Sequence, residues 1–521
     1  MRLPQITSSD NRTSSITDRF LGVNQNMITS RGEWAAMKNM CDQHYPAIST
    51  RPARGTVEKT FENPKGIFYK NGLFYIDGTK AYYKDKEVFT VADDGDKKLV
   101  GIGAYICVFP DHIIFNTFTG AVDHMTAKVS GSAVFAPLSK GSVFTKITLA
   151  GIGNTFKTGD NVTISGASNS EYNGTKVITD GSTDYIIVTG SLTDQFTSTA
   201  TFERKVPDMD FITERDNRLW GCSSKNHEVY CCKVGDPKNW YNYEKEANNA
   251  WAATVGSDGD FTGISKYGTY LVFFKESTFH VLRGDKPSNF SLLEKTLPGV
   301  RAGCDRSLVT INETLYYVSR DGVYRYLGGV PEKISTNITQ EITDAAAAQY
   351  DGKLYLSCKL GGAQTLLVYD PLTSVWDVED DATFKFVQYS EGMLHYVDAA
   401  NNLRDIYGSD TEPIRWFLES GDLRGSAMEQ KYVSKVLINF VMPVGSEVKF
   451  FAKFDDGPMW EQKGFIRSAM DKTYTIPIIP RRCSKYRIRI EGTGPCKIVA
   501  MANTIELGSE INGYIHTGYR R

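Results

Sequence analysis

The chain has 521 residues, of which 41% are hydrophobic and 12% aromatic. This length exceeds the size of one hydrophobic core, and the composition excludes a disordered protein, so two or three domains are expected. The 59 basic and 61 acidic side chains give a formal net charge of −2, which argues against a surface built mainly to grip nucleic acid, because phosphate binding usually shows as a basic excess.

Residues 1–60 predict an extended, polar N-terminal arm that contains one short helix. The opening MRLPQITSSDNRTSS lacks the apolar segment of a signal peptide, and no window approaches the roughly 20 apolar residues that span a bilayer. We therefore expect neither secretion nor a membrane anchor. Helical signal is confined to residues 31–41 (RGEWAAMKNMC) and 335–349 (STNITQEITDAAAAQ), the second with a Ser/Thr cap.

From residue 61 onward one unit recurs. It begins with a turn pair and a strand of aliphatic and aromatic residues, and it continues with a short polar break and a second strand. This pattern is typical of β-hairpins. Seven units occur, centred on Phe74, Ile106, Leu219, Leu271, Leu315, Leu354 and Leu394. From the third unit to the seventh the steps are about 39 to 52 residues, the range of four-stranded propeller blades.

The spacing predicts an all-β chain in which residues 61–138 and 207–410 form a six- or seven-bladed β-propeller. A β-sandwich or solenoid with regular meanders is the alternative. Residues 139–206 interrupt the period with their own short strands and Gly-Asp and Asn-Gly turns. They are predicted to be a small β domain inserted into a blade loop, where insertions are tolerated.

The last part of the chain has a different pattern. Residues 411–508 contain strands with clean alternation, as in 485–490, where apolar residues occupy every second position. Such alternation predicts half-buried strands in a separate C-terminal β-sandwich. Residues 509–521 are expected to form a tail.

The nine cysteines do not form a disulfide framework. They are scattered, odd in number and never spaced as CxxC, and several lie inside hydrophobic strand patterns. Buried thiols behave as small hydrophobic side chains. This usage predicts a reducing compartment during assembly.

Candidate metal ligands are few. The seven histidines never occur at HxH or HxxxH spacing, and His280 and His395 lie in strands between aromatic residues, where packing and hydrogen bonding are favoured over ligation. The acidic clusters at 93–96 and 258–260 resemble fragments of calcium loops, but neither continues to the glutamate that closes an EF-hand. We predict turns there, and no metal or cofactor site.

Catalytic motifs are incomplete as well. Residues 151–158 (GIGNTFKT) resemble a phosphate-binding loop, but Phe156 stands where the second glycine must clear the phosphates. No GxSxG turn occurs, and no Cys–His pair has a recognisable orienting residue. Trp240 and Trp376 follow Asp-Pro turns, where packing is favoured over ligand contact. We therefore name no catalytic, cofactor-binding or metal residue and predict that the chain is not an enzyme.

Several segments resemble one protein family. They are GVNQNMITSRGEWAAMKNM at 22–40 with YPAISTRP after it, the turns GDPKNW and VYDPLTSVW, and IPRRCSKYRIRIEGTGPCKI at 479–498. Together with the repeated hairpins they are similar to the tail-nozzle, or packaged-DNA-stabilization (tail hub), proteins of tailed phages. The similarity covers most of the chain and is weakest in the inserted domain.

The resemblance implies a structural virion protein of the phage tail, assembled in the host bacterial cytoplasm. It implies a homo-oligomeric ring, expected to be a hexamer, at the distal end of the portal and adaptor proteins. Such a ring extends the DNA channel, retains packaged DNA until ejection and attaches tail-fibre or tail-tip proteins. Double-stranded DNA would pass without sequence-specific binding, which suits the near-neutral charge. The arm before Glu33 could drape over a neighbouring subunit.

An alternative function is a propeller-type tail protein that binds or degrades carbohydrate. Propeller glycosidases use carboxylates that point into a central well, and such pairing cannot be recognised in the sequence. No particular Asp or Glu is therefore nominated.

Overall fold

The computed structural model describes residues 12–93, 95–244, 246–409, 412–424, 431–467, 472–479 and 481–507. Strands dominate these ranges, so the all-β prediction is confirmed. The helical elements in the same ranges are three single turns, namely α1 (Ile152–Thr155), η1 (Ser170–Tyr172) and η2 (Asp305–Ser307). None of these described helices is long and apolar enough to cross a membrane.

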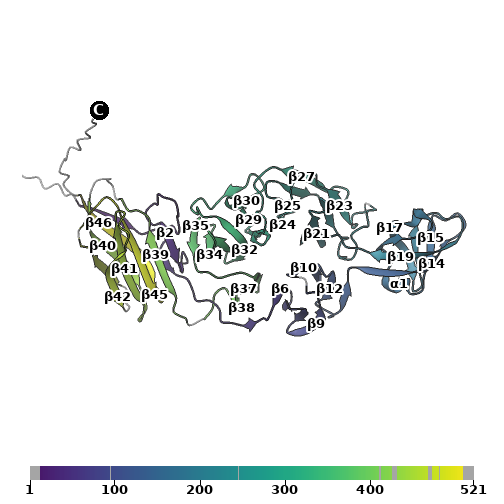
Figure 1. Ribbon diagram of the computed structural model, residues 1–521, viewed down its shortest axis with the longest axis horizontal. Helices are drawn as coiled ribbons and strands as arrows, with labels where there is room; N and C mark the ends of the chain where they lie inside the picture. The colour runs from purple at the N-terminus through teal and green to yellow at the C-terminus, as the bar shows by residue number, and fades with distance from the viewer. Residues whose placement is uncertain are drawn as a thin grey trace, which may run out of the picture.

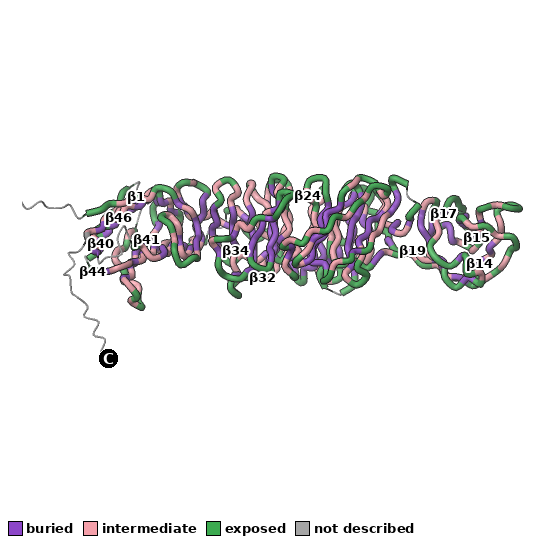
Figure 2. The backbone as a smooth tube through the Cα atoms, turned by 90° about the horizontal axis from the view of Figure 1, so that it is seen from above, coloured by how far each residue is buried: buried purple, intermediate pink, exposed green. Residues whose placement is uncertain are grey.

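Three bodies lie in a row along the long axis of the molecule (Figures 1 and 2). A pair of larger sheets, which contains the C-terminal strands, occupies one end. A group of small sheets lies in the middle, and a barrel projects from the other end.

The middle body consists of seven antiparallel sheets of four strands each, numbered here from first to seventh in chain order. The first contains β6 (Pro64–Tyr69), β7 (Leu73–Asp77), β8 (Lys80–Tyr83) and β9 (Lys86–Thr90). The second contains β10 (Lys98–Ile102), β11 (Tyr105–Phe109), β12 (Ile113–Asn116) and β13 (Val122–His124). The third contains β20 (Phe211–Arg215), β21 (Arg218–Ser223), β22 (Glu228–Cys231) and β23 (Trp251–Thr254).

The remaining four sheets follow the same pattern. The fourth contains β24 (Gly263–Tyr267), β25 (Tyr270–Phe274), β26 (Phe279–Arg283) and β27 (Ser291–Lys295). The fifth contains β28 (Val309–Ile311), β29 (Thr314–Ser319), β30 (Gly322–Tyr326) and β31 (Glu332–Lys333). The sixth contains β32 (Ile342–Tyr350), β33 (Lys353–Leu360), β34 (Ala363–Asp370) and β35 (Val375–Val378). The seventh contains β36 (Phe386–Ser390), β37 (Met393–Val397), β38 (Asn402–Asp405) and β5 (Lys59–Thr60).

The repeated hydrophobic residue of the sequence lies in the second strand of every sheet. The seven positions fall in β7, β11, β21, β25, β29, β33 and β37, and each side chain is at most 1% exposed. These strands pack against the neighbouring sheet. Phe74 of the first sheet, for example, shares a core with Ile106 of the second, and Leu394 of the seventh shares one with Tyr355 of the sixth. Each sheet thereby buries apolar side chains that it could not bury alone.

The seven sheets contact one another in cyclic order through their first strands. Each first strand contacts the next, and β36 of the seventh sheet contacts β6 of the first. The seventh sheet is completed from the N-terminal region, because β5 pairs with β38, with Thr60 opposite Asn402 and Lys59 opposite Leu403. The start and the end of this part of the chain therefore meet in one sheet.

The inserted region forms a barrel of six strands. In barrel order they are β14 (Ala127–Pro137), β15 (Phe144–Thr148), β18 (Tyr185–Thr189), β17 (Gly174–Ser182), β16 (Asn161–Ser165) and β19 (Phe196–Arg204). The barrel begins at Ala127, upstream of the predicted range 139–206, because β14 pairs with β19 along nearly its whole length. An ion pair of 3.0 Å between Arg204 Nη1 and Asp160 Oδ2, together with a hydrogen bond from Arg204 Nε to Met125 O, fixes its base.

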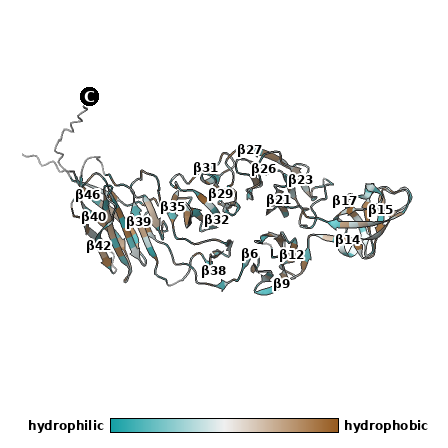
Figure 3. Cartoon of the chain, in the orientation of Figure 1, coloured by the Kyte–Doolittle hydropathy of each residue, from teal (hydrophilic) through white to brown (hydrophobic). Residues whose placement is uncertain are grey.

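The end body is a sandwich of two sheets. One contains β1 (Arg12–Thr17), β3 (Met40–Cys41), β4 (Ile48–Thr50), β40 (Lys431–Val441), β43 (Lys472–Pro477), β44 (Arg482–Cys483) and β46 (Lys497–Leu507). The other contains β2 (Trp34–Lys38), β39 (Arg415–Ser420), β41 (Glu447–Phe454), β42 (Glu461–Arg467) and β45 (Tyr486–Thr493). Hydrophobic and hydrophilic residues alternate along these strands (Figure 3). Phe440 and Phe450 meet between the sheets with ring centroids 5.5 Å apart.

Both predicted helices are wrong. Within residues 31–41 the chain forms β2, which pairs with β39 and buries Trp34 and Met37, and β3, which pairs with β4. Residues 342–349 belong to β32, where Ala345 to Ala348 are all buried on the crowded inner strand of the sixth sheet. Alanine favours a helix by intrinsic propensity, but here its small size suits close packing, and tertiary context overrides propensity.

The predicted N-terminal arm is also different in the structure. Residues 12–60 do not extend away from the chain but contribute five strands to its own sheets, with Arg12 opposite Glu506 and Lys59 opposite Leu403. The sandwich is therefore built from both ends of the chain, and not from residues 411–508 alone. Residues 1–11 and the predicted tail at 509–521 lie outside the described residues.

Gly22 is expected to be a stability determinant of the N-terminal segment. Its φ is +70°, and a Cβ there would lie 2.2 Å from Trp376 O and 2.5 Å from Val375 Cγ1. We expect Gly22→Ala to lower the free energy of unfolding by about 3 kcal/mol, from overpacking and from the left-handed backbone. Urea unfolding measures this loss.

Gly78→Ala provides the matched control. Gly78 has φ +60°, but no atom lies within 4 Å of the position that a Cβ would take there, so only the backbone cost of about 1 kcal/mol applies. Equal losses in the two variants would show that the contact between Gly22 and the sixth sheet contributes nothing.

Candidate functional site

The residues singled out in the sequence mostly have structural roles. His280 is 3% exposed, and its Nε2 lies 2.8 Å from Ser257 Oγ. Trp240 donates from Nε1 to Pro237 O at 2.8 Å, and Trp376 donates to Ile334 O at 2.9 Å, both as buried side chains. The interpretation of these residues as packed and hydrogen bonded agrees with their surroundings.

The segment that resembles a phosphate loop is part of the barrel. Its short helix α1 packs against β18, and a Cβ at Gly153 would lie 1.7 Å from Ser182 O. Lys157, two residues after α1, donates from Nζ to Gly153 O of that helix at 2.7 Å. The acidic pair Asp258 and Asp260 lies exposed in a turn. Asp94, in the other acidic cluster, is outside the described residues.

The cysteines do not form a nucleophilic site. All nine are buried with free thiols. Burial raises the pKa of each thiol. A nucleophilic cysteine requires a lowered pKa and access to substrate, and these thiols have neither.

A buried charge network joins the N-terminal segment to the sixth sheet. Arg54 Nη2 lies 2.7 Å from Glu379 Oε2 and 2.9 Å from Asp380 Oδ1, and Arg51 Nη2 lies 2.9 Å from Asp380 Oδ2. Burial alone would raise the pKa of Asp380, but the two guanidiniums hold it below its ordinary value. Tyr407 donates a hydrogen bond to Glu379 from the other side. Glu379 and Asp380 are thus each matched by a donor, which is the arrangement that a buried ion requires.

A cleft of about 1380 Å³ lies beside this network, between the sixth and seventh sheets and the sandwich. Seven basic and six acidic side chains line it. Several are paired with each other, as in the 2.6 Å contact of Arg489 Nε with Glu491 Oε1. Opposite charges compensate here, so the cleft lacks the field of one sign that would select a phosphate or a cationic ligand.

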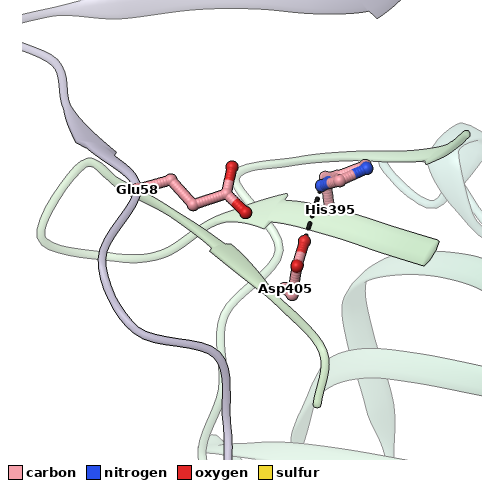
Figure 4. Close-up of side chains that lie close together, drawn as sticks. All are labelled: Glu58, His395 and Asp405. Atoms are coloured by element: carbon pink, nitrogen blue, oxygen red, sulfur yellow. Dashed lines mark ion pairs between the residues drawn. The ribbon is translucent and has the colours of Figure 1, made fainter. Parts of the chain in front are cut away.

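One cluster was missed by the sequence analysis. Glu58, His395 and Asp405 bring their ligand atoms within 4.8 Å of one another, and Figure 4 shows the three side chains converging. His395 Nδ1 lies 2.6 Å from Asp405 Oδ1. The sequence offered one indication of this cluster, namely the hairpin that places His395 opposite Asp405. Nothing local in the sequence pointed to Glu58, because it belongs to the distant N-terminal segment. Among the described residues it is the one group of three His, Cys, Asp or Glu side chains with this spacing.

Comparisons with known proteins give no family. No family model and no curated protein matches the chain. Among solved structures, a computationally designed protein, Ika8, is 12% identical with a TM-score of 0.35, covering 68% of this chain and 100% of its own. BamB from Moraxella catarrhalis is 12% identical with a TM-score of 0.31, covering 73% and 98%. An exo-β-1,3-galactanase from Phanerochaete chrysosporium is 9% identical with a TM-score of 0.24, covering 56% and 94%. All three TM-scores are low.

Proposed function

We propose that this chain is a structural subunit of a tailed-phage virion, which forms a ring at the distal end of the portal–adaptor complex. The resemblance of the segments at 22–40 and 479–498 to tail-nozzle proteins motivates the proposal. The observation that carries it is the linear arrangement of three bodies, in which the barrel and the sandwich project from opposite ends of the small sheets (Figure 1). Such a subunit can contact different neighbours through separate bodies.

The middle body is proposed to be a seven-bladed β-propeller. The seven four-stranded sheets, the cyclic contacts between their first strands and the completion of the seventh sheet by β5 all support this architecture. A propeller closed by strands from both ends of its segment is a rigid spacer. It would hold the barrel and the sandwich at a set distance within the ring.

Exposed apolar side chains on all three bodies support a role in assembly. Large apolar residues that lie at least half exposed include Val143 of the barrel, Phe118 and Leu372 of the small sheets, and Val444 and Ile479 of the sandwich. Single exposed apolar residues are common on monomers, but their presence on loops at both ends suits a subunit that is contacted there.

The charge of the chain suits a DNA channel. With a formal net charge of −2, a ring of such subunits would neutralise few phosphates and would release few counterions on contact with DNA. Double-stranded DNA could then pass without being held. Portal, adaptor and tail-fibre or tail-tip proteins are the partners proposed for the two ends.

The proposal predicts a ring in solution or on the virion. Sedimentation of the purified chain should give a species near six times 58.1 kDa, and electron microscopy should show a ring with a central pore. Antibodies against the chain should label the virion tail. A chain that stays monomeric and never labels a virion contradicts the proposal.

The carbohydrate alternative has its own readout. Hydrolysis of a glycan by the purified chain, abolished by changing one carboxylate of the propeller well, would replace the structural function with an enzymatic one. Micromolar glycan binding without ring formation would indicate an adhesin.

A further inference from the structure

The Glu58–His395–Asp405 cluster lies on two adjacent strands of the seventh sheet and on the residue that precedes its fourth strand, β5. His395 of β37 lies directly opposite Asp405 of β38 in the pairing register. Glu58 immediately precedes β5, and its backbone N donates to Leu403 O at 3.0 Å on the other edge of β38. The cluster therefore sits at the place where the N-terminal segment joins the last sheet and completes the cycle.

One pair of atoms in the cluster, on His395 and Asp405, converges without a hydrogen bond of normal geometry. His395 Nδ1 and Asp405 Oδ1 are 2.6 Å apart, yet both are shielded from solvent and neither makes a hydrogen bond of normal geometry. In the tautomer that carries its hydrogen on Nε2, the imidazole Nδ1 presents a lone pair, and the carboxylate oxygen opposite presents lone pairs as well. Two lone pairs at this distance repel each other, and a cation bound to both atoms would remove that repulsion as they move apart to ligand spacing.

A tyrosine of the first sheet covers the imidazole of the cluster. Tyr69, at the end of β6, stacks on the His395 ring with centroids 4.6 Å apart. The stacked tyrosine restricts the imidazole to one orientation, in which Nδ1 faces Asp405.

The nearby cationic side chains have other partners. Lys59 Nζ lies 2.5 Å from Asp85 Oδ1, and Arg404 Nε lies 3.2 Å from Asp398 Oδ2. These pairs leave Glu58 and Asp405 as two neighbouring carboxylates beside one imidazole. A divalent cation would match that charge and would use both kinds of ligand atom.

We propose that Glu58, His395 and Asp405 bind one divalent transition-metal cation of the Zn²⁺ type, which ties the N-terminal strand β5 to the sheet that closes the cycle. Imidazole nitrogen favours such cations over Mg²⁺ and Ca²⁺, which prefer oxygen ligands alone. Ligands about 2.0–2.2 Å from one ion lie at most about 4.4 Å apart. The exposed Glu58 side chain therefore has to turn inward only slightly.

Each residue has a separate task in this site. His395 supplies the nitrogen ligand, and its ring orientation is held by the stacked Tyr69 of the first sheet. Asp405 supplies the second ligand from β38, and Glu58 brings the N-terminal segment to the ion. Because a preformed site is absent from the unfolded chain, the cation would bind the folded state and stabilise it by mass action.

Calorimetric titration of the full-length chain with ZnCl₂ at pH 7 tests the site. We expect one Zn²⁺ per chain for the unmodified protein, and binding on the order of tenfold weaker or more for Glu58→Gln and Asp405→Asn, since each loses a ligand. Glu62→Gln is the matched control, because Glu62 is an exposed glutamate four residues away that lies outside the cluster. It should bind Zn²⁺ like the unmodified chain.

Thermal unfolding gives a second readout that does not depend on a fragile variant. Glu58 is exposed, so Glu58→Gln should fold normally and keep the melting temperature of the metal-free protein. Saturating Zn²⁺ should raise the melting temperature of the unmodified chain and of Glu62→Gln, but not that of Glu58→Gln. The proposal is overturned by absence of stoichiometric Zn²⁺ binding, by equal binding in all variants, or by tighter binding of Ca²⁺ than of Zn²⁺.

Discussion

Arg54→Met is expected to lower the free energy of unfolding by about 3 to 5 kcal/mol, because it leaves the buried Glu379 carboxylate without its cationic partner and Asp380 with Arg51 alone. The side chain of Glu379 is 0% exposed and that of Asp380 is 11% exposed, and both lie within 2.9 Å of Arg54 Nη2. Arg54 also donates from Nη1 to Ile406 O at 2.9 Å. Methionine keeps most of the apolar stem but none of these contacts.

Arg325→Met is the matched control for Arg54→Met, because it breaks an exposed ion pair instead of a buried one. Urea unfolding of the two variants compares their losses of stability. Arg325 lies 2.7 Å from Glu332, but the two side chains are 31% and 61% exposed, so its loss should cost no more than about 1 kcal/mol. Equal effects of the two substitutions would show that the buried network adds nothing beyond a surface ion pair.

Acid provides an independent check on the same network. The pKa of Asp380 is lower in the folded chain than in the unfolded chain, where an aspartate has a pKa of about 3.9. The ion pair therefore contributes its full stability above about pH 4. This contribution is lost as the pH falls through the folded pKa of Asp380. The difference in stability between the unmodified chain and Arg54→Met should therefore shrink below about pH 4.

The features that could be predicted from the sequence are those that depend on residues close together in the chain. Each of the seven hydrophobic repeat positions, from Phe74 to Leu394, lies in the second strand of its sheet, because hairpin pairing and alternation are local. The alternation at 485–490 likewise gives a strand with Tyr486, Ile488 and Ile490 buried. A strand that is buried on one face alternates between apolar and polar residues, and this alternation can be recognised without knowing the partner strand.

The features that escaped prediction depend on partners far away in the chain. Strands β3 and β5 have two residues each, too few for a periodic pattern, and they form because β4 and β38 offer a paired edge. Ala345 to Ala348 carry a helical signal that packing on the inner strand reverses. Glu58 and His395 are brought together only by the pairing of β5 with β38, so neither spacing nor composition could have pointed to their cluster.

Removal of residues 1–60 is expected to abolish cooperative unfolding and to send the chain into the insoluble fraction. It deletes β1 to β5, which uncovers the edges of β38, β39 and β46, and unpaired edges promote aggregation. Six buried apolar side chains would leave the core, namely Phe20, Val23, Trp34, Met37, Met40 and Ile48. At about 1.5–3 kcal/mol each, their burial matches the whole stability of a typical domain, about 5–15 kcal/mol.

Circular dichroism and urea unfolding measure the effect, with a chain that lacks only residues 1–11 as control, since it keeps every described strand. If the segment were instead an independent arm, the shorter chain would unfold with an unchanged midpoint.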